Sequence, residues 1–189
     1  SGAEIMTGFI RQTRAAFDDI GKEKDRALGL AVRVPNTIAG AKRLGLDVSQ
    51  WVEQGLVDMV IPSSFFAQDT EENVAEWVRL AEGTPVQIQP CIDEAYLAGH
   101  TGELRRWYLK PPMMTPLSVE MTRAIAARHL SKGVDGLYLF NYFGTAMTYD
   151  YDNLEVVDDI GDPQRLKHKD KCYMVTRSGE QDNDSFPNC

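Results

Sequence analysis

The sequence predicts an α/β fold, namely a partial (β/α)8 TIM-type barrel of about four parallel strands with helices. Short apolar runs alternate with helical segments along the chain. Three helical segments end at a glycine, and an apolar run begins one or two residues after Gly55, Gly83 and Gly133. Repeated units of this kind form parallel sheets with right-handed crossovers. No Gly-x-Gly-x-x-Gly follows any run, which favours a barrel over an open nucleotide-binding sheet.

Four runs are rich in Val, Ile and Leu, and this composition is typical of strands buried on both faces of a parallel sheet. The predicted strands comprise residues 27–34, 57–61, 85–92 and 134–140. A complete barrel needs eight strands and about 250 residues. The 189 residues present therefore leave two open sheet edges, which we expect to pair with another copy or with a missing barrel half.

Helix signals lie between these runs. The predicted helices span residues 5–20, 37–44, 48–54, 71–82 and 119–132, with a further turn over 154–160. The expected N-caps are short polar side chains, which accept hydrogen bonds from the first helical amides. They are Asn36, Asp47, Ser118 and either Asp69 or Thr70. Gly21 is expected to end the first helix. We expect one domain over residues 1–176, followed by a polar, disordered tail over 177–189.

Composition limits the partners. The net charge is −8 and the isoelectric point about 4.9, which argues against nucleic acid and anionic membranes. No apolar run approaches the roughly 20 residues that span a bilayer, so we expect a soluble protein. The three cysteines, without a Cys-x-x-Cys pair, predict no disulfide framework and no zinc site. The histidines lack metal-ligand spacing, so we expect no metal and no cofactor.

Ligands of parallel α/β folds bind at the carboxyl ends of the strands. The polar residues near the predicted ends are therefore the candidate substrate-binding residues: Arg33, Asn36, Ser63, Gln89, Asn141 and Tyr142. Arg33 interrupts an apolar strand. If it is buried, it needs a carboxylate or an anionic ligand as partner, or it forms a structural ion pair. Amide and phenol groups, as in Asn141 and Tyr142, suit sugar hydroxyls.

Asp93 and Glu94 are the candidate catalytic residues, because they are the carboxylates at a predicted strand end. Adjacent residues of a strand face opposite sides, so they do not form an acid/base pair with each other. Glycoside hydrolysis needs two carboxyl groups about 5 to 9.5 Å apart, and no second candidate stands at the other strand ends. The catalytic set is therefore expected to be incomplete in this chain, and the alternative role of Asp93 or Glu94 is a loop cap.

The segment Leu44-Gly-Leu-Asp-Val-Ser-Gln-Trp-Val-Glu-Gln-Gly-Leu-Val-Asp-Met-Val-Ile-Pro62 resembles bacterial glycoside hydrolase family 10-like TIM-barrel proteins. Residues 31–35, 133–142 and 160–163 fit the same pattern, and the resemblance covers roughly residues 5–176. It implies that the four strands are the fifth to eighth of a barrel. It also implies that Arg33, Asp93 and Asn141 line the cleft. A secreted or periplasmic bacterial parent protein is compatible with it.

The leading hypothesis is a glycosidase-like barrel fragment that binds or hydrolyses a carbohydrate. Two other functions remain open. The first is a non-catalytic, sugar-binding or self-associating half-barrel. The second is an aldolase-like or phosphate-binding barrel enzyme. That enzyme would need a lysine at a strand end or a glycine-rich loop after the last strands, and Phe143-Gly-Thr-Ala matches such a loop poorly.

Overall fold

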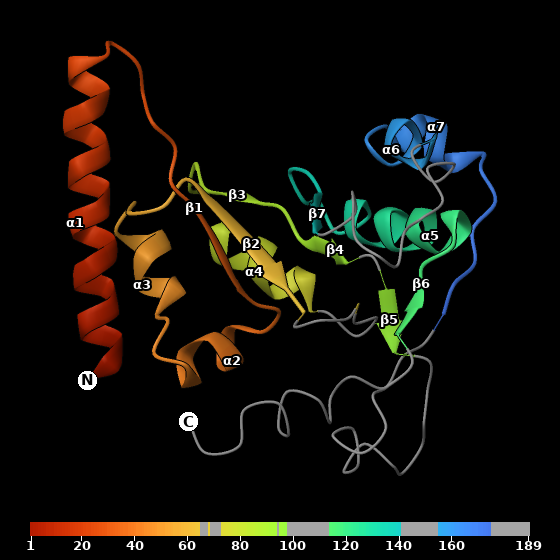
Figure 1. Ribbon diagram of the computed structural model, residues 1–189, viewed down its shortest axis with the longest axis horizontal. Helices are drawn as coiled ribbons and strands as arrows, with labels where there is room; N and C mark the ends of the chain where they lie inside the picture. Colours follow the sequence, from red (N-terminus) through yellow and green to blue (C-terminus); the bar gives the residue numbers. More distant parts are fainter. Residues whose placement is uncertain (65–67, 69–72, 94, 98–113, 141–154, 175–189) are drawn as a thin grey trace.

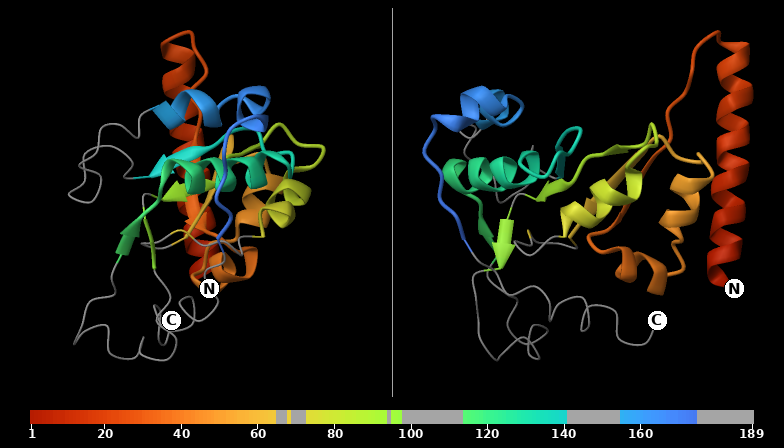
Figure 2. Two further views of the ribbon diagram at one scale, coloured as in Figure 1. Left: turned by 90° about the vertical axis from the view of Figure 1, so that its right-hand side faces the viewer. Right: turned by 180° about the vertical axis from the view of Figure 1, so that it is seen from behind.

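The computed structural model describes residues 1–64, 68, 73–93, 95–97, 114–140 and 155–174. These residues form a mixed α/β structure with short parallel strands in small sheets. Helix α1 (Gly2–Glu23) lies at one end and the strands occupy the middle (Figure 1 and Figure 2). The other end is formed by α5 (Val119–Leu130), α6 (Glu155–Ile160) and α7 (Pro163–Lys167). Within the described part of the chain the sheets do not close into a barrel.

The first sheet contains β1 (Ala31–Pro35), β2 (Met59–Ser63) and β3 (Gln87–Ile88), all parallel and in chain order. A second sheet pairs β4 (Cys91–Asp93) with β7 (Tyr138–Phe140), again in parallel. The predicted parallel βα organisation is therefore confirmed for these strands. The finer prediction, half of a (β/α)8 barrel, is not established by this geometry.

The third predicted strand is split in two at Pro90, whose ring nitrogen carries no hydrogen to donate. The Gln89 amide still donates to the Val60 carbonyl at 3.0 Å, and the Pro90 carbonyl accepts from the Tyr138 amide at 3.0 Å. The segment thus joins the two sheets. Side by side, the parallel strands lie in the order β1, β2, then the broken strand β3–β4, and then β7.

A short antiparallel ribbon was not predicted. It pairs β5 (Ala95–Leu97) with β6 (Met114–Pro116). The sequence lacks the alternation and turn signals that would identify such short strands, because residues 93–116 read as one long connection.

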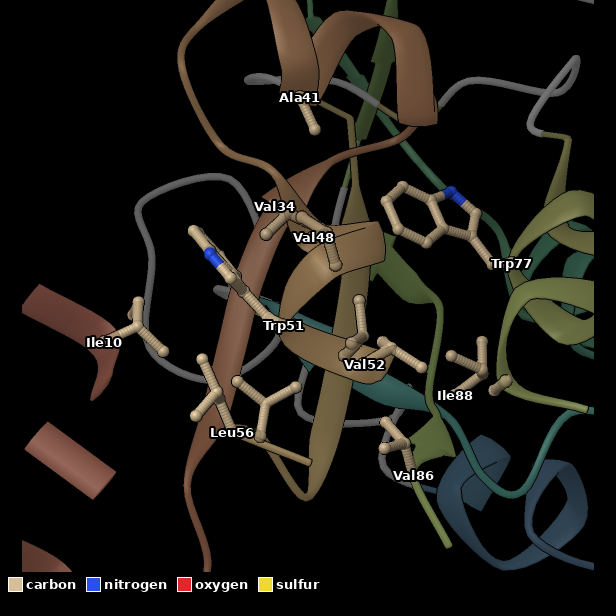
Figure 3. Packing of buried hydrophobic residues seen from close by; sticks show 13 residues of the cluster. Ile10, Val34, Ala41, Val48, Trp51, Val52, Leu56, Trp77, Val86 and Ile88 are labelled. Atoms are coloured by element: carbon tan, nitrogen blue, oxygen red, sulfur yellow. The ribbon is translucent and has the colours of Figure 1, made fainter. Parts of the chain in front are cut away.

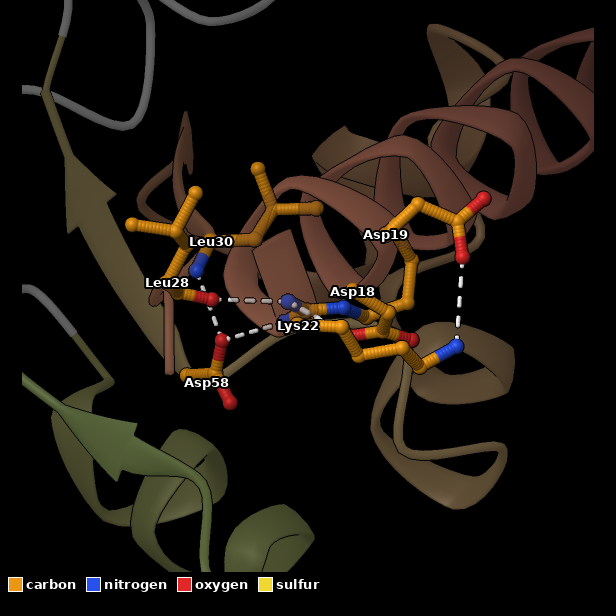
Figure 4. Close-up of polar contacts among 7 residues, drawn as sticks. Asp18, Asp19, Lys22, Leu28, Leu30 and Asp58 are labelled. Carbon is orange, nitrogen blue, oxygen red and sulfur yellow. Dashed lines mark hydrogen bonds and ion pairs between the residues drawn. The ribbon is translucent and has the colours of Figure 1, made fainter. Parts of the chain in front are cut away.

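Each observed strand begins two to four residues later than predicted. Val57 before β2 and Val86 before β3 are buried but do not pair as strand residues, and Leu28 and Leu30 before β1 are half-buried. At the start of β2, the Asp58 carboxylate instead accepts the Leu30 amide at 2.6 Å and a guanidinium nitrogen of Arg14 at 2.7 Å (Figure 4). The strand starts were therefore predicted too early, because apolar character does not show where strand pairing begins.

The helices after α1 are shorter than it. Their bounds are α2 (Ile38–Arg43), α3 (Val48–Glu53), α4 (Val74–Ala81), α5 (Val119–Leu130), α6 (Glu155–Ile160) and α7 (Pro163–Lys167). The Asp47 and Ser118 caps are confirmed, since their side chains accept from Gln50 and Met121 amides. The cap of α2 is Thr37 rather than Asn36. Asp69 and Thr70 lie outside the described residues.

The end of the first helix was predicted wrongly. Gly21 is inside α1, which continues to Glu23. The glycine is needed for a different reason: a β-carbon there would lie 2.8 Å from the Arg26 carbonyl oxygen, because the chain folds back over the helix. Gly55, Gly83 and Gly133, in contrast, follow helices with positive φ angles of 63°, 75° and 82°, as glycine stops do.

The main core lies between the first sheet and the helices (Figure 3). Val34 and Val60 of the strands pack with Trp51 of α3 and Trp77 of α4, and all four are at most 3% exposed. A second core joins Ile92 of β4 to α5, α6 and α7. On the opposite face of this sheet, the buried Ile61 of β2 lies beside the polar Arg33 and Ser63.

No helix among the described residues is long and apolar enough to cross a membrane. Residues 172–174 belong to no helix or strand. The predicted tail over 177–189 and the boundary at 176 lie outside the described residues.

Candidate functional site

The strands present their alternate residues on a face away from the helices. Val34 packs toward the helices, so Arg33 points to the opposite face, and Ser63 lies on the same face because Arg33 pairs with Ile61 in the register. In the second sheet, Ile92 packs toward α5, so its neighbour Asp93 also turns to the opposite face. Polar residues from separate strands thus share one face near the strands' carboxyl ends.

Arg33 is held by two contacts. Its Nε donates to the Ser63 Oγ at 2.9 Å, and the Ser63 hydroxyl donates in turn to the Ser64 carbonyl at 2.9 Å. The guanidinium carbon lies 3.5 Å from the centroid of the Phe140 ring, a cation–π distance. Arg33 is in the first strand and Phe140 in the last described one. The stack therefore links the outer strands of the parallel series.

Arg33 is exposed, so the condition under which a buried arginine would require an anionic partner is not met. Its contacts are a hydroxyl and an aromatic ring. In the described part of the chain, no carboxylate forms an ion pair with it. The apolar residues around it in the sequence belong to the helix-facing side of β1, which explains why its own side chain escapes burial.

Asp93 lies at the end of β4 and is 4% exposed. Its backbone amide donates to the Gln68 Oε1 at 2.9 Å, and Gln68 is itself 2% exposed. In the register Asp93 is opposite Phe140, so the carboxylate and the ring that supports Arg33 are side by side. The structure thereby brings three predicted site residues, Arg33, Ser63 and Asp93, to one face around Phe140.

Two predicted binding residues serve other purposes in the described structure. Asn36 is 4% exposed. The indole N–H of Trp77 donates to the backbone carbonyl of Asn36 at 2.8 Å, and this hydrogen bond connects α4 to the end of β1. Gln89 donates to Gln87 at 3.3 Å and packs against Gly136. It precedes Asp93 by four residues, roughly 13 Å along an extended strand, so it lies below the strand ends.

Glu94, Asn141 and Tyr142 lie outside the described residues. Phe140 and Gln68 were not predicted as part of the site. Phe140 had an available signal, since it ends a predicted strand and so shares the edge with Asp93. Gln68 had none, because it follows β2 in a segment with no helix or strand pattern.

The charged groups elsewhere are structural. Arg123 of α5 and Lys169 contact Asp159 of α6 at 2.8 and 3.3 Å. Burial acts to raise the pKa of Asp159, but hydrogen bonds from Arg123 and Lys169 outweigh it and lower that pKa. Among the described residues, no group of three or more His, Cys, Asp or Glu side chains is placed to hold a metal ion.

Among the described residues, the strand ends thus bring together an oriented cation, an aromatic ring and a buried carboxylate. A comparison of the sequence with protein-family models and with curated proteins found no match.

Proposed function

We propose that this chain is part of a glycoside hydrolase-like (β/α)8 barrel that binds or hydrolyses a carbohydrate at the carboxyl ends of its strands. The observation that carries the proposal is the convergence of Arg33, Ser63 and Asp93 on one face around Phe140. Carbohydrate sites combine polar groups that bind hydroxyls with aromatic rings that contact the sugar face. The chain-order arrangement of parallel strands, with helices on the opposite face, supports the half-barrel architecture.

In this proposal Arg33 positions the substrate and Asp93 acts as one acid/base carboxylate. The position of Asp93 suits that role, because it ends β4 on the face that carries Arg33, where ligands of parallel α/β folds bind. The second carboxylate comes from outside the described residues. Glu94, Asn141 and Tyr142 remain proposed members of the site.

The test uses the 189-residue chain and a panel of oligosaccharides. Binding is measured as retention of the oligosaccharide by the chain, and turnover as the release of new reducing ends. Asp93→Asn is expected to retain binding and to lower turnover by about 100-fold, the usual contribution of acid–base catalysis. Asp158→Asn, at an exposed helical position, is the control. Unchanged turnover in Asp93→Asn would exclude its catalytic role, and failure to bind any oligosaccharide would overturn the proposal.

A non-catalytic half-barrel that binds sugar or self-associates is the second candidate. It is favoured by one observation: Asp93 is the single carboxylate that the described strand ends bring to this face. Binding without turnover would support it. Its self-association is tested by light scattering, because two open sheet edges that complete one another give a dimer of defined mass.

A further inference from the structure

We infer that the proposed sugar site selects an acidic saccharide, whose carboxylate is bound by the outer edge of the Arg33 guanidinium. This inference rests on the proposed function and deepens it. A guanidinium carries five N–H groups in a rigid plane, and the Nε–H of Arg33 is occupied by the Ser63 hydroxyl.

The remaining donors, on Nη1 and Nη2, meet no acceptor among the residues that the structure describes. They form the outer edge of the group, which matches the two oxygens of a carboxylate. Because Arg33 is exposed, a ligand can reach this edge.

The plane of the guanidinium is fixed before any ligand arrives. Stacking on Phe140 at 3.5 Å holds its tilt, and the Ser63 hydrogen bond at 2.9 Å holds its rotation within the plane. Ser63 is 6% exposed and is itself oriented by its bond to the Ser64 carbonyl. A preoriented fork loses less conformational entropy on binding than a free side chain.

General electrostatic attraction does not explain such a site. The chain carries a net charge of −8, which repels anions at long range. Recognition of a carboxylate must therefore come from the local geometry around Arg33. A neutral sugar would leave the charged edge without an anionic partner and would gain weaker, uncharged hydrogen bonds from it.

The probes are acidic oligosaccharides, namely oligogalacturonates, alginate fragments and hyaluronan fragments. Each is paired with the same compound after reduction of its carboxyl groups to alcohols. Affinity is measured on the 189-residue chain by ligand-observed NMR and calorimetry. At least one acidic compound is expected to bind about tenfold or more tightly than its reduced form, the difference made by a charge-assisted hydrogen bond.

Variants separate charge from geometry. Arg33→Gln is expected to remove the preference, Arg33→Lys to lose most of it because lysine lacks the planar fork, and Ser63→Ala to weaken it several-fold. Arg79→Gln, on the exposed surface of α4, is the matched control and should retain it. Circular dichroism and thermal melting confirm that each variant folds.

Equal binding of the acidic and reduced forms overturns the inference but leaves the proposed sugar site standing. Unchanged selectivity in Arg33→Gln overturns it as well. If inorganic sulfate binds at Arg33 as tightly as the best acidic oligosaccharide, the site is a simple anion site and the inference fails. Absence of binding by every oligosaccharide, acidic or neutral, removes both the inference and the proposed function.

Discussion

Asp58 and Leu30 exchange two hydrogen bonds between neighbouring chain segments. The Leu30 amide donates to the Asp58 Oδ2 at 2.6 Å, and the Asp58 amide donates to the Leu30 carbonyl at 2.9 Å. Asp135 and Ile88 repeat the arrangement at 2.8 and 3.0 Å. Each aspartate follows a valine just before a strand. In both places, the aspartate of a Val-Asp pair just before one strand is therefore hydrogen-bonded to the neighbouring segment of the sheet.

Replacement of Asp135 by alanine is expected to lower the free energy of unfolding by about 1 to 2 kcal/mol, because the Ile88 amide loses its acceptor at a site that is 1% exposed. Asp135→Asn keeps an acceptor oxygen and should cost less. Urea denaturation measures both. Equal losses in the two variants would mean that the charge, rather than the hydrogen bond, stabilises this junction.

Thr7 anchors α1 to the core through one buried contact: its Oγ1 accepts the indole hydrogen bond of Trp51 at 2.9 Å. Thr7→Val removes the acceptor while keeping the shape, and the cost is expected to be about 1 to 3 kcal/mol because a buried donor is left without a partner. Because Trp51→Phe removes the donor, the double variant should lose less stability than the sum of the two single losses.

The coupling between Thr7 and Trp51 is measured by a double-mutant cycle in urea. Thr7→Ser retains the oxygen and serves as the control. Additive losses in the double variant would show that the hydrogen bond contributes nothing to the docking of α1.

The features that could be predicted from sequence are those set by local chemistry. Asp47 and Ser118 cap their helices because a short acceptor beside free amides suffices. Gly55, Gly83 and Gly133 end helices because their backbones are left-handed. From these caps and glycine stops the order of the helices and the parallel strands could be predicted, and hence the α/β fold class.

The environment of Arg33 could not be predicted, because it depends on residues far away in the chain. Phe140 is 107 positions from it, and the stack exists only once the sheet has formed. The pairing of Asp93 with Gln68 depends in the same way on how the segment after β2 returns to the sheet. Sequence identifies polar residues at strand ends, while their partners follow from tertiary structure.

Two of the three glycines of α1, Gly8 and Gly21, make a matched pair. A β-carbon at Gly21 would meet the Arg26 carbonyl oxygen at 2.8 Å, whereas one at Gly8 would meet nothing within 4 Å. Gly8→Ala is expected to stabilise the protein by about 0.5 to 1 kcal/mol through helix propensity. Gly21→Ala should destabilise it, because the returning chain must shift. Denaturation of both variants checks this, and stabilisation by Gly21→Ala would show that the turn adapts without cost.

Asp159 is expected to govern part of the acid sensitivity of the protein. Although burial acts to raise its pKa, hydrogen bonds from Arg123 and Lys169 keep that pKa below the ordinary value. The folded state thus favours the carboxylate. Its contribution to stability is fully present above the unfolded-state pKa of about 3.9. It is lost as the pH falls from there through the lower folded-state pKa.

Asp159→Asn should therefore be less stable than the wild type at pH 7, and this difference should shrink below about pH 4. The free energy of unfolding is measured by urea titration at several pH values between these limits. The exposed neighbour Asp158, replaced by asparagine, provides the control and should leave the pH profile close to that of the wild type. A gap that stays constant with pH would show that Asp159 acts through packing, because only a titrating carboxylate ties the loss of stability to protonation.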